Sequence, residues 1–406
     1  MPIYLRVLFL VVVSGVGVGL SAYTLSRLGF LIESAAQTQI LSTVFTLDLV
    51  EITETIQMIK STLHTCTAWV SSAGLMICYF LVGTSLPARG LRWLGWLSGG
   101  WMGYVTLLLS FGGLSHLIEW SLISPLAPAY GPAWSLLTLI VIHLAWPIGL
   151  WSATRPPALA EVEVNSSRIG PELDGLRIVQ LSDVHIGPTV GIRFVEHLHE
   201  RCVALKPDLI VMTGDLVDGA TRYLGAEVSR FLELRELAPR GMYMITGNHE
   251  YISGARSWVE YVKARGVTVL ENAAETITVG DSALHLIGVE DWDAERFDRT
   301  REPSLERALA GLPEGGYRVL LAHQPKAAPE ASALGIDLQL SGHTHGGQIF
   351  PLTHLIYIDQ PYNVGRYQVG DLTLYVNPGT GYWGPPLRLG TRAEITLITL
   401  RSTRGA

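Results

Sequence analysis

The spacing of hydrophobic residues divides the chain into two parts. Residues 1–153 contain apolar runs of about 20 residues near 5–23, 67–86, 93–114 and 134–151, and runs of that length can cross a bilayer as helices. After residue 175 the apolar runs shorten to strand length, are rich in Val, Ile and Leu, and alternate with helical stretches. This change predicts an all-α transmembrane domain followed by an α/β domain over 175–402.

Parts of the first 174 residues allow more than one interpretation. The run at 5–23 is interpreted as an uncleaved helix rather than a signal peptide, because further spans follow it and no small-residue cleavage site does. Residues 28–61 carry four acidic residues, which favours amphipathic helices outside the bilayer, with a fifth span as the alternative. His143, inside the last span, is either a functional residue or a neutral histidine bonded to a neighbouring helix. Residues 154–174, rich in Pro and acids, are expected to be an exposed linker.

Charge is concentrated in the second part of the chain. Only six of the 29 Lys and Arg and five of the 36 Asp and Glu lie within residues 1–160. With four spans, the basic segments before the first, between the second and third, and after the last span fall on one side, so the positive-inside rule predicts a cytoplasmic α/β domain. The net charge of −7 argues against a nucleic-acid partner, because counterion release needs a basic surface.

Side chains that bind metals follow five of the strand-like runs. The five sequences are Ser-Asp183-Val-His185, Gly-Asp215, Gly-Asn248-His249-Glu250, Ala-His323 and Gly-His343-Thr-His345-Gly-Gly-Gln348. Ligands of open α/β sheets gather beyond the carboxyl ends of the strands, so these side chains are expected to meet. Carboxylate, amide and imidazole donors without sulfur suit Mn, Fe or Zn. One such sequence is usually a turn, but five in this order favour a two-metal site.

This ordered series resembles the calcineurin-like metallophosphoesterase superfamily over about residues 176–400, and its last motif with Gly-Pro-Pro-Leu-Arg-Leu-Gly is similar to the bacterial membrane-associated branch. The resemblance implies a four-layer α/β sandwich of two mixed sheets flanked by helices, two divalent metal ions and a bacterial-type plasma membrane location. It also implies the metal ligands: Asp183, His185, Asp215 and His345 for one ion, and Asp215, Asn248, His323 and His343 for the other. His249 is similar to the family's general acid.

We therefore expect a membrane-anchored hydrolase of phosphomonoesters or phosphodiesters, for which the nearby bilayer makes a lipid-linked substrate a candidate. A hydroxide held by the two metals would attack phosphorus, and His249 would protonate the leaving oxygen. Two alternatives stay open: a nucleotide or cyclic-nucleotide phosphodiesterase with the helices as a simple anchor, and a metal-binding membrane sensor without turnover. Arg366 and Arg388 are candidates for binding phosphate, and Asp218 and Glu250 for orienting the imidazoles.

Overall fold

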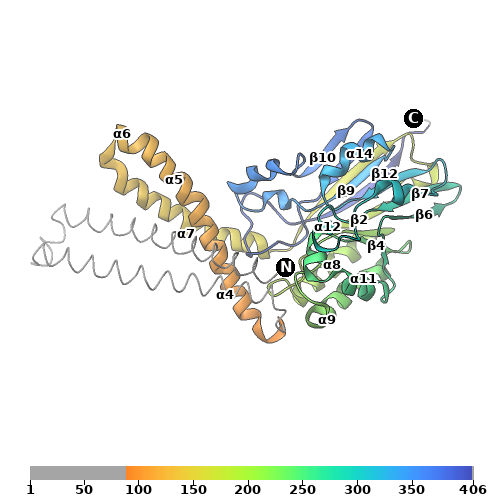
Figure 1. Cartoon of the computed structure of the whole chain (residues 1–406), viewed down its shortest axis with the longest axis horizontal. Helices are drawn as coiled ribbons and strands as arrows, with labels where there is room; N and C mark the ends of the chain where they lie inside the picture. The colour runs from red at the N-terminus through yellow and green to blue at the C-terminus, as the bar shows by residue number, and fades with distance from the viewer. Residues whose placement is uncertain (1–87, 405–406) are drawn as a thin grey trace, which may run out of the picture. The chain divides into compact units, whose positions relative to one another are not determined.

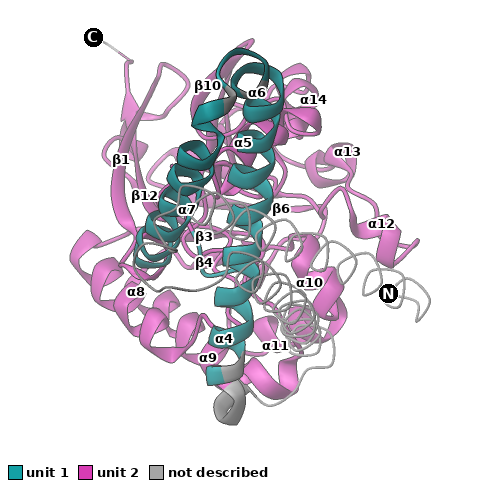
Figure 2. Cartoon of the chain, turned by 90° about the vertical axis from the view of Figure 1, so that its left-hand side faces the viewer, with its two compact units in different colours: residues 1–84, 93–151, 385–387 teal, residues 85–92, 152–384, 388–406 magenta. Residues whose placement is uncertain are grey.

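The computed structural model describes residues 88–404, and these belong to two compact units. Figure 2 colours the units: among the described residues, unit 1 holds 93–151 and 385–387, and unit 2 holds 88–92, 152–384 and 388–404. The spans predicted near 5–23 and 67–86, and the segment 28–61, lie outside the described residues. Each unit is described here by itself.

Unit 1 is helical (Figure 1). Its elements are α4 (Ala88–Leu107), η1 (Leu108–Gly112), α5 (Gly113–Ile118), η2 (Glu119–Ile123), α6 (Ser124–Leu126), η3 (Pro128–Tyr130) and α7 (Gly131–Thr154). By length and composition, the helical stretches Gly95–Ile123 and Gly131–Thr154 can each cross a membrane. They overlap the spans predicted at 93–114 and 134–151, so the expected helical character of this segment is confirmed.

His143 of α7 is bonded on both ring nitrogens. Its Nδ1 lies 2.7 Å from the carbonyl oxygen of Leu139, one turn earlier, and its Nε2 lies 3.2 Å from the hydroxyl of Tyr104 in α4. A polar side chain in an apolar helix is stabilised by such contacts with its own and a neighbouring helix. This geometry favours the structural interpretation of His143.

Unit 2 is built on two six-stranded mixed sheets, with strand orders β1-β12-β2-β3-β4-β5 and β10-β11-β9-β8-β7-β6. β2 to β5 run parallel, and so do β7, β8, β9 and β11. The strands are β1 (Ala158–Ser166), β2 (Arg177–Leu181), β3 (Leu209–Thr213), β4 (Met242–Ile245), β5 (Thr268–Val269), β6 (Ala273–Val279), β7 (Ser282–Gly288), β8 (Tyr317–Leu321), β9 (Leu338–Ser341), β10 (Gly365–Val369), β11 (Leu372–Val376) and β12 (Glu394–Ser402).

Helices cover the outer face of each sheet (Figure 1). Those of unit 2 are η4 (Pro171–Leu173), α8 (Ile192–Leu205), α9 (Thr221–Leu232), η5 (Glu233–Leu237), α10 (Asn248–Ser253), α11 (Ala255–Lys263), α12 (Ala294–Phe297), α13 (Leu305–Leu309), η6 (Pro325–Ala327), α14 (Ala328–Ala333), η7 (His345–Gly347) and η8 (Leu352–Ile358). Alternate residues of each strand point to opposite faces. In β2, Ile178 enters the core between the sheets while Val179 packs in the core beneath α8, α9 and α11. The expected four-layer sandwich is confirmed.

Part of the segment expected to be a linker forms regular secondary structure. β1 lies within residues 154–174 and pairs in parallel with β12 at the edge of the first sheet. Most of its side chains are at least partly exposed, which is why an edge strand of this kind reads as polar in the sequence. As a result, only residues 155–157 separate the end of α7 from the start of β1.

The five metal-binding sequences follow the carboxyl ends of neighbouring parallel strands. β2, β3 and β4 of the first sheet end at Leu181, Thr213 and Ile245, and β8 and β9 of the second end at Leu321 and Ser341. Each of the five sequences begins within two residues of one of these ends. Since parallel strands end at a common edge, the fold brings all five loops together.

Candidate metal centre

One group of ligand atoms forms around Asp183 at the end of β2. His345 Nε2 lies 3.3 Å and His185 Nε2 lies 4.0 Å from Asp183 Oδ1, and the two imidazole nitrogens are 3.1 Å apart. His185 Nε2 is also 3.8 Å from Asp215 Oδ2. Atoms bound about 2.0–2.2 Å from one metal ion lie about 3–3.5 Å from each other, so this spacing suits a single cation.

A second group forms around Asn248 at the start of α10. Asn248 Oδ1 is 3.2 Å from both His323 Nε2 and His343 Nδ1, which are themselves 3.2 Å apart. His323 Nε2 is also 3.2 Å from Asp215 Oδ2. Four atoms with lone pairs therefore converge here, again at the spacing of a cation's ligands.

Asp215 connects the two groups through one oxygen atom. Its Oδ2 faces His185 on one side and His323 on the other, whereas its Oδ1 accepts the backbone N–H of His249 at 2.8 Å. The carboxylate thus orients Oδ2 toward both groups and uses Oδ1 to position the loop that carries Asn248 and His249.

The backbone around these side chains is strained. Among the described residues, eight non-glycine residues have φ between 43° and 71°. Six of the eight belong to the metal-binding sequences: Asp183, His185, Asp215, His343, His345 and Gln348. Side chains rarely occupy this region, at a cost of about 1–3 kcal/mol each, and such strain collects at functional sites. The donor types, their spacing and this strain all fit a metal centre.

Asp218 holds two of the imidazoles. Its Oδ1 accepts hydrogen bonds from His185 Nδ1 at 2.9 Å and from His249 Nδ1 at 2.6 Å. The Nδ1–H of His185 is thereby committed to Asp218, which leaves its Nε2 lone pair directed at Asp183 and Asp215. A carboxylate of this kind fixes the tautomer and orientation of a ligating imidazole.

Glu250 joins the loop after β3 to the loop after β4. Its carboxylate accepts the backbone N–H groups of Gly247 at 2.7 Å, Asp215 at 2.8 Å and Leu216 at 2.7 Å. Glu250 is fully buried. It therefore sets the position of Asp215 relative to Asn248 without reaching either group of ligand atoms itself.

The pKa shifts of Asp183, His343 and His345 favour their metal-binding forms. For His323, by contrast, burial is outweighed by the carboxylates of Asp215, Asp183 and Asp291, which hold the pKa well above the usual range. Burial opposes ionisation of Asp183, yet the neighbouring His345 and His323 hold the pKa of its carboxyl below the usual range. Burial lowers the pKa of His343 to about 3 and that of His345 to about 4. At neutral pH this places an ionised carboxylate beside neutral imidazoles, and these are the forms that bind metals.

His249 keeps its proton more strongly than a free histidine. Burial alone would lower its pKa, but the carboxylates of Asp218 and Asp215 outweigh burial and raise the pKa to about 9. Its ring meets that of Trp383 edge to face at 5.9 Å between centroids, and Trp383 is 53% exposed. A protonated imidazole therefore lies at the border between the buried ligands and solvent.

The two arginines expected to bind phosphate contact backbone carbonyl oxygens in the structure. Arg388 is fully buried, and its guanidinium donates to the carbonyl oxygens of Pro378 and Gly381, both at 2.7 Å, and of His345 at 3.2 Å. Arg366 donates to the carbonyl oxygen of Glu163 in β1 at 3.1 Å. Arg388 therefore holds the backbone of the loop that carries His345, and phosphate binding by either arginine stays a prediction.

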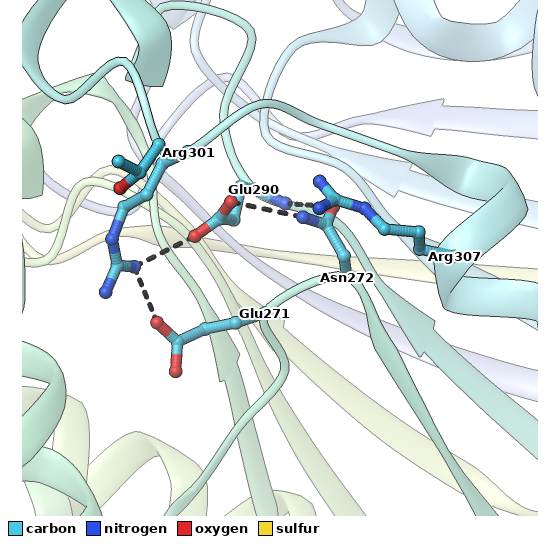
Figure 3. A pocket seen from close by; sticks show the side chains of 6 residues that line it. Glu271, Asn272, Glu290, Arg301 and Arg307 are labelled. Carbon is cyan, nitrogen blue, oxygen red and sulfur yellow. Dashed lines mark hydrogen bonds and ion pairs between the residues drawn. The ribbon is translucent and has the colours of Figure 1, made fainter.

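A polar pocket of ≈ 430 Å³ lies beyond the ends of β5 and β7. Figure 3 shows Arg301 between Glu271 and Glu290, with Nη1 at 2.6 and 2.9 Å from their carboxylates. Asn272 donates to Glu290 at 3.1 Å, and Arg307 also lines the pocket. The acidic and basic groups neutralise one another, so we assign no ligand to this pocket.

Several residues within the predicted motifs make supporting contacts that the sequence did not predict. Ser182 Oγ donates to Asp183 Oδ2 at 2.5 Å, and Gln348 forms a pair of hydrogen bonds with the backbone of Trp383, at 2.8 and 2.9 Å. Gly247 approaches Asp215 so closely that a Cβ would lie 2.3 Å from Oδ1. Ser182, Gly247 and Gln348 all stand in the predicted motifs, but a motif alone does not predict such contacts.

Comparisons with known proteins agree with this geometry. The model of the calcineurin-like phosphoesterase family matches residues 176–347. "Transmembrane protein with metallophosphoesterase domain" of Danio rerio is 35% identical over 348 residues, covering 81% of this chain and 77% of that protein. The protein of the same name from Bos taurus is 39% identical over 287 residues, covering 68% and 63%. "Uncharacterized metallophosphoesterase YkuE" of Bacillus subtilis is 34% identical over 249 residues, covering 60% and 85%.

Proposed function

Because this chain belongs to the calcineurin-like phosphoesterase family and is a metal-dependent hydrolase of phosphoester bonds, we propose that it uses two divalent cations to hydrolyse a lipid-linked phosphoester. The observation that carries the proposal is the position of Asp215 Oδ2 between the two groups of ligand atoms. A shared carboxylate is what a pair of neighbouring cations needs. The mixed oxygen and nitrogen donors suit Mn, Fe or Zn.

Different residues of the chain contribute to different parts of the hydrolysis. Two cations held here would polarise the phosphoryl oxygens and lower the pKa of a water molecule, which is the chemistry that such metals supply. His249 donates through Nε2 to the departing oxygen, because its Nδ1–H is committed to Asp218 at 2.6 Å. Asp218 stabilises the protonated ring, and Trp383 covers one edge of it.

The membrane location supports a lipid-linked substrate. The relatives from Danio rerio and Bos taurus are named as transmembrane proteins, and the chain has two helical stretches apolar and long enough to cross a bilayer. Arg155 follows α7 directly, and Arg89 and Arg92 lie in α4, so the basic residues favour a cytoplasmic catalytic domain. A catalytic domain joined to α7 through three residues stays close to substrates in the membrane.

The test uses the full-length protein in lipid vesicles, loaded with Mn²⁺. Elemental analysis is expected to find two metal ions per chain, and hydrolysis is expected for a lipid phosphoester and an aryl phosphodiester. Asp215→Asn is expected to lose both ions and turnover together. A single ion per chain at saturating metal would refute the shared role of Asp215. Hydrolysis of a cyclic nucleotide alone, with the lipid untouched, would overturn the substrate proposal.

A second variant tests the proton donor. His249→Ala is expected to retain metal and to slow hydrolysis of an alkyl phosphodiester by about 10²–10⁴-fold, because an alkoxide leaves poorly without a proton. An aryl ester should lose much less, because a phenolate is a better leaving group. His197→Ala is the matched control, since His197 lies on α8 with its side chain 54% exposed. Equal rates of alkyl ester hydrolysis by His249→Ala and by the control would refute the role of His249 as proton donor.

A further inference from the structure

The helix η8 exposes apolar side chains to an unusual degree. Its sequence is Leu-Thr-His-Leu-Ile-Tyr-Ile, and none of its seven residues is buried. Leu355 is 57% exposed, Tyr357 56% and Ile358 82%. Single exposed hydrophobic residues are common, but an exposed cluster beside a functional site indicates an interaction surface.

This cluster lies beside the last metal-binding sequence. Gly347 packs so tightly on η8 that a Cβ would lie 2.3 Å from Thr353 Cα, and its φ of +73° also favours glycine. The next residue, Gln348, holds the backbone of Trp383, whose exposed ring contacts His249. We name Leu355, Tyr357, Ile358 and Trp383 the apolar rim. The rim therefore includes residues of η8, on the loop that carries His343 and His345, and Trp383, whose ring contacts His249.

The chain itself limits what can cover the rim. Residues 155–157 are the only connection between α7 and β1, and three extended residues span at most about 11 Å. Two of the three are prolines, which stiffen the connection. If α7 crosses the bilayer, the catalytic domain is held at the membrane surface and cannot diffuse away from it. The nearest apolar partner is then the bilayer.

We propose that the apolar rim inserts into the surface of the bilayer that holds α7. Its composition suits that location, because Trp and Tyr combine an apolar ring with a polar atom and are enriched at membrane interfaces. Insertion would place the metal-binding loop at the headgroup level, where a phosphoester lipid could reach His249 without leaving the membrane. The proposed insertion does not depend on which substrate is hydrolysed, whereas the access of a lipid to His249 rests on the proposed function.

Depth measurements on the full-length protein in vesicles test the insertion directly. A spin label is attached at Ile358→Cys in a Cys66→Ser and Cys78→Ser background, where the remaining Cys202 is buried. Relaxation by oxygen is expected to exceed relaxation by a water-soluble nickel chelate, as for a group about 5–10 Å inside the headgroup boundary. Glu200→Cys on α8, with a native side chain 76% exposed, is the control and should show the opposite ratio.

Two results would overturn the insertion. Nickel accessibility at position 358 equal to that at position 200 would place the rim in water. Protection from both oxygen and nickel would mean that protein covers the rim, either a second copy or another part of this chain.

Activity measurements connect the rim to the substrate. The triple variant Leu355→Glu, Tyr357→Glu and Ile358→Glu is expected to hydrolyse a soluble aryl phosphoester at the wild-type rate. Its hydrolysis of a lipid phosphoester in the same vesicles should fall at least about fivefold, because carboxylates oppose interfacial binding. Val203→Glu, at a residue of α8 that is 56% exposed, is the control. Equal losses on both esters would refute a role in lipid access, whereas wild-type protein inactive on every ester would refute the proposed function and leave the spin-label result intact.

Discussion

Replacing Asp218 with Asn tests whether one carboxylate serves both metal binding and proton donation. The side chains are nearly equal in size, so the packing is preserved while the negative charge is lost. Asp218 Oδ1 accepts from His185 Nδ1 at 2.9 Å and from His249 Nδ1 at 2.6 Å. Hydrogen bonds to charged groups contribute about 1.5–3 kcal/mol each, so both imidazoles should be affected.

The two effects of Asp218→Asn can be measured separately. Loss of the partner that orients a ligating imidazole typically weakens metal affinity about 10–100-fold, or about 1.4–2.7 kcal/mol. Competition with a chelator, followed by elemental analysis, gives that affinity for the ion beside His185. Removal of the carboxylate should also lower the pKa of His249 from its value of about 9. The rate with a poor leaving group should therefore begin to fall at a lower pH than in the wild type.

Asp371→Asn, in the exposed turn between β10 and β11, controls for the loss of one negative charge. It is expected to change neither metal affinity nor the pH profile. If Asp218→Asn keeps wild-type affinity within twofold and an unchanged profile, the two hydrogen bonds do not set the behaviour of the site. A loss of affinity with an unchanged profile would refute only the link to His249.

Three further predictions concern the protonation of His249, its response to bound cations, and the contacts of Arg388. The pKa of His249 is about 9 in the folded protein, above the ordinary value near 6.5. Protonation of His249 therefore stabilises the fold by about 3 kcal/mol below about pH 6.5, and this contribution is lost as pH rises through 9. Thermal unfolding without added metal should show this loss of stability with pH in the wild type and not in His249→Gln. Bound cations should lower the titration midpoint of His249, as followed by histidine NMR, because like charges disfavour the protonated ring. Arg388→Met should destabilise the fold by about 3 kcal/mol or more in denaturant titrations, because the buried carbonyl oxygens of Pro378 and Gly381 lose their donor; wild-type stability would contradict the clamp.

The strands that carry the site could be predicted from sequence because each is a short apolar run between polar turns. The apolar runs at 176–181, 209–213 and 338–340 correspond to β2, β3 and β9 within one or two residues. β1 was missed because an edge strand beside solvent contains polar residues at alternate positions. Its partner β12 lies more than 200 residues later in the chain, so no local pattern reveals the pairing.

The ligand-like residues were visible in the sequence, and Asp218 and Glu250 were candidates for supporting them, but the contacts that these and other supports make were not predicted. Asp183, Asp215 and His343 follow strand ends, which is a local property. That Asp218 contacts two imidazoles, and that Arg388 is buried against the carbonyl oxygens of residues 345, 378 and 381, depends on contacts between distant segments. Surface exposure is the usual state of arginine, so the burial of Arg388 could not be predicted from its local sequence.

The six left-handed residues around the site have a consequence for assembly of the holoenzyme. Glu250 accepts from the backbone of the loops after β3 and β4, and Arg388 donates to the carbonyl oxygen of His345, so contacts within the protein compensate for the local strain. Loops fixed in this way let a cation bind with little of its binding free energy spent on reshaping them. Glycine at position 343 or 345 would relax the backbone but would also remove a metal ligand. The backbone strain at these two positions therefore cannot be relieved in this way without loss of the metal site.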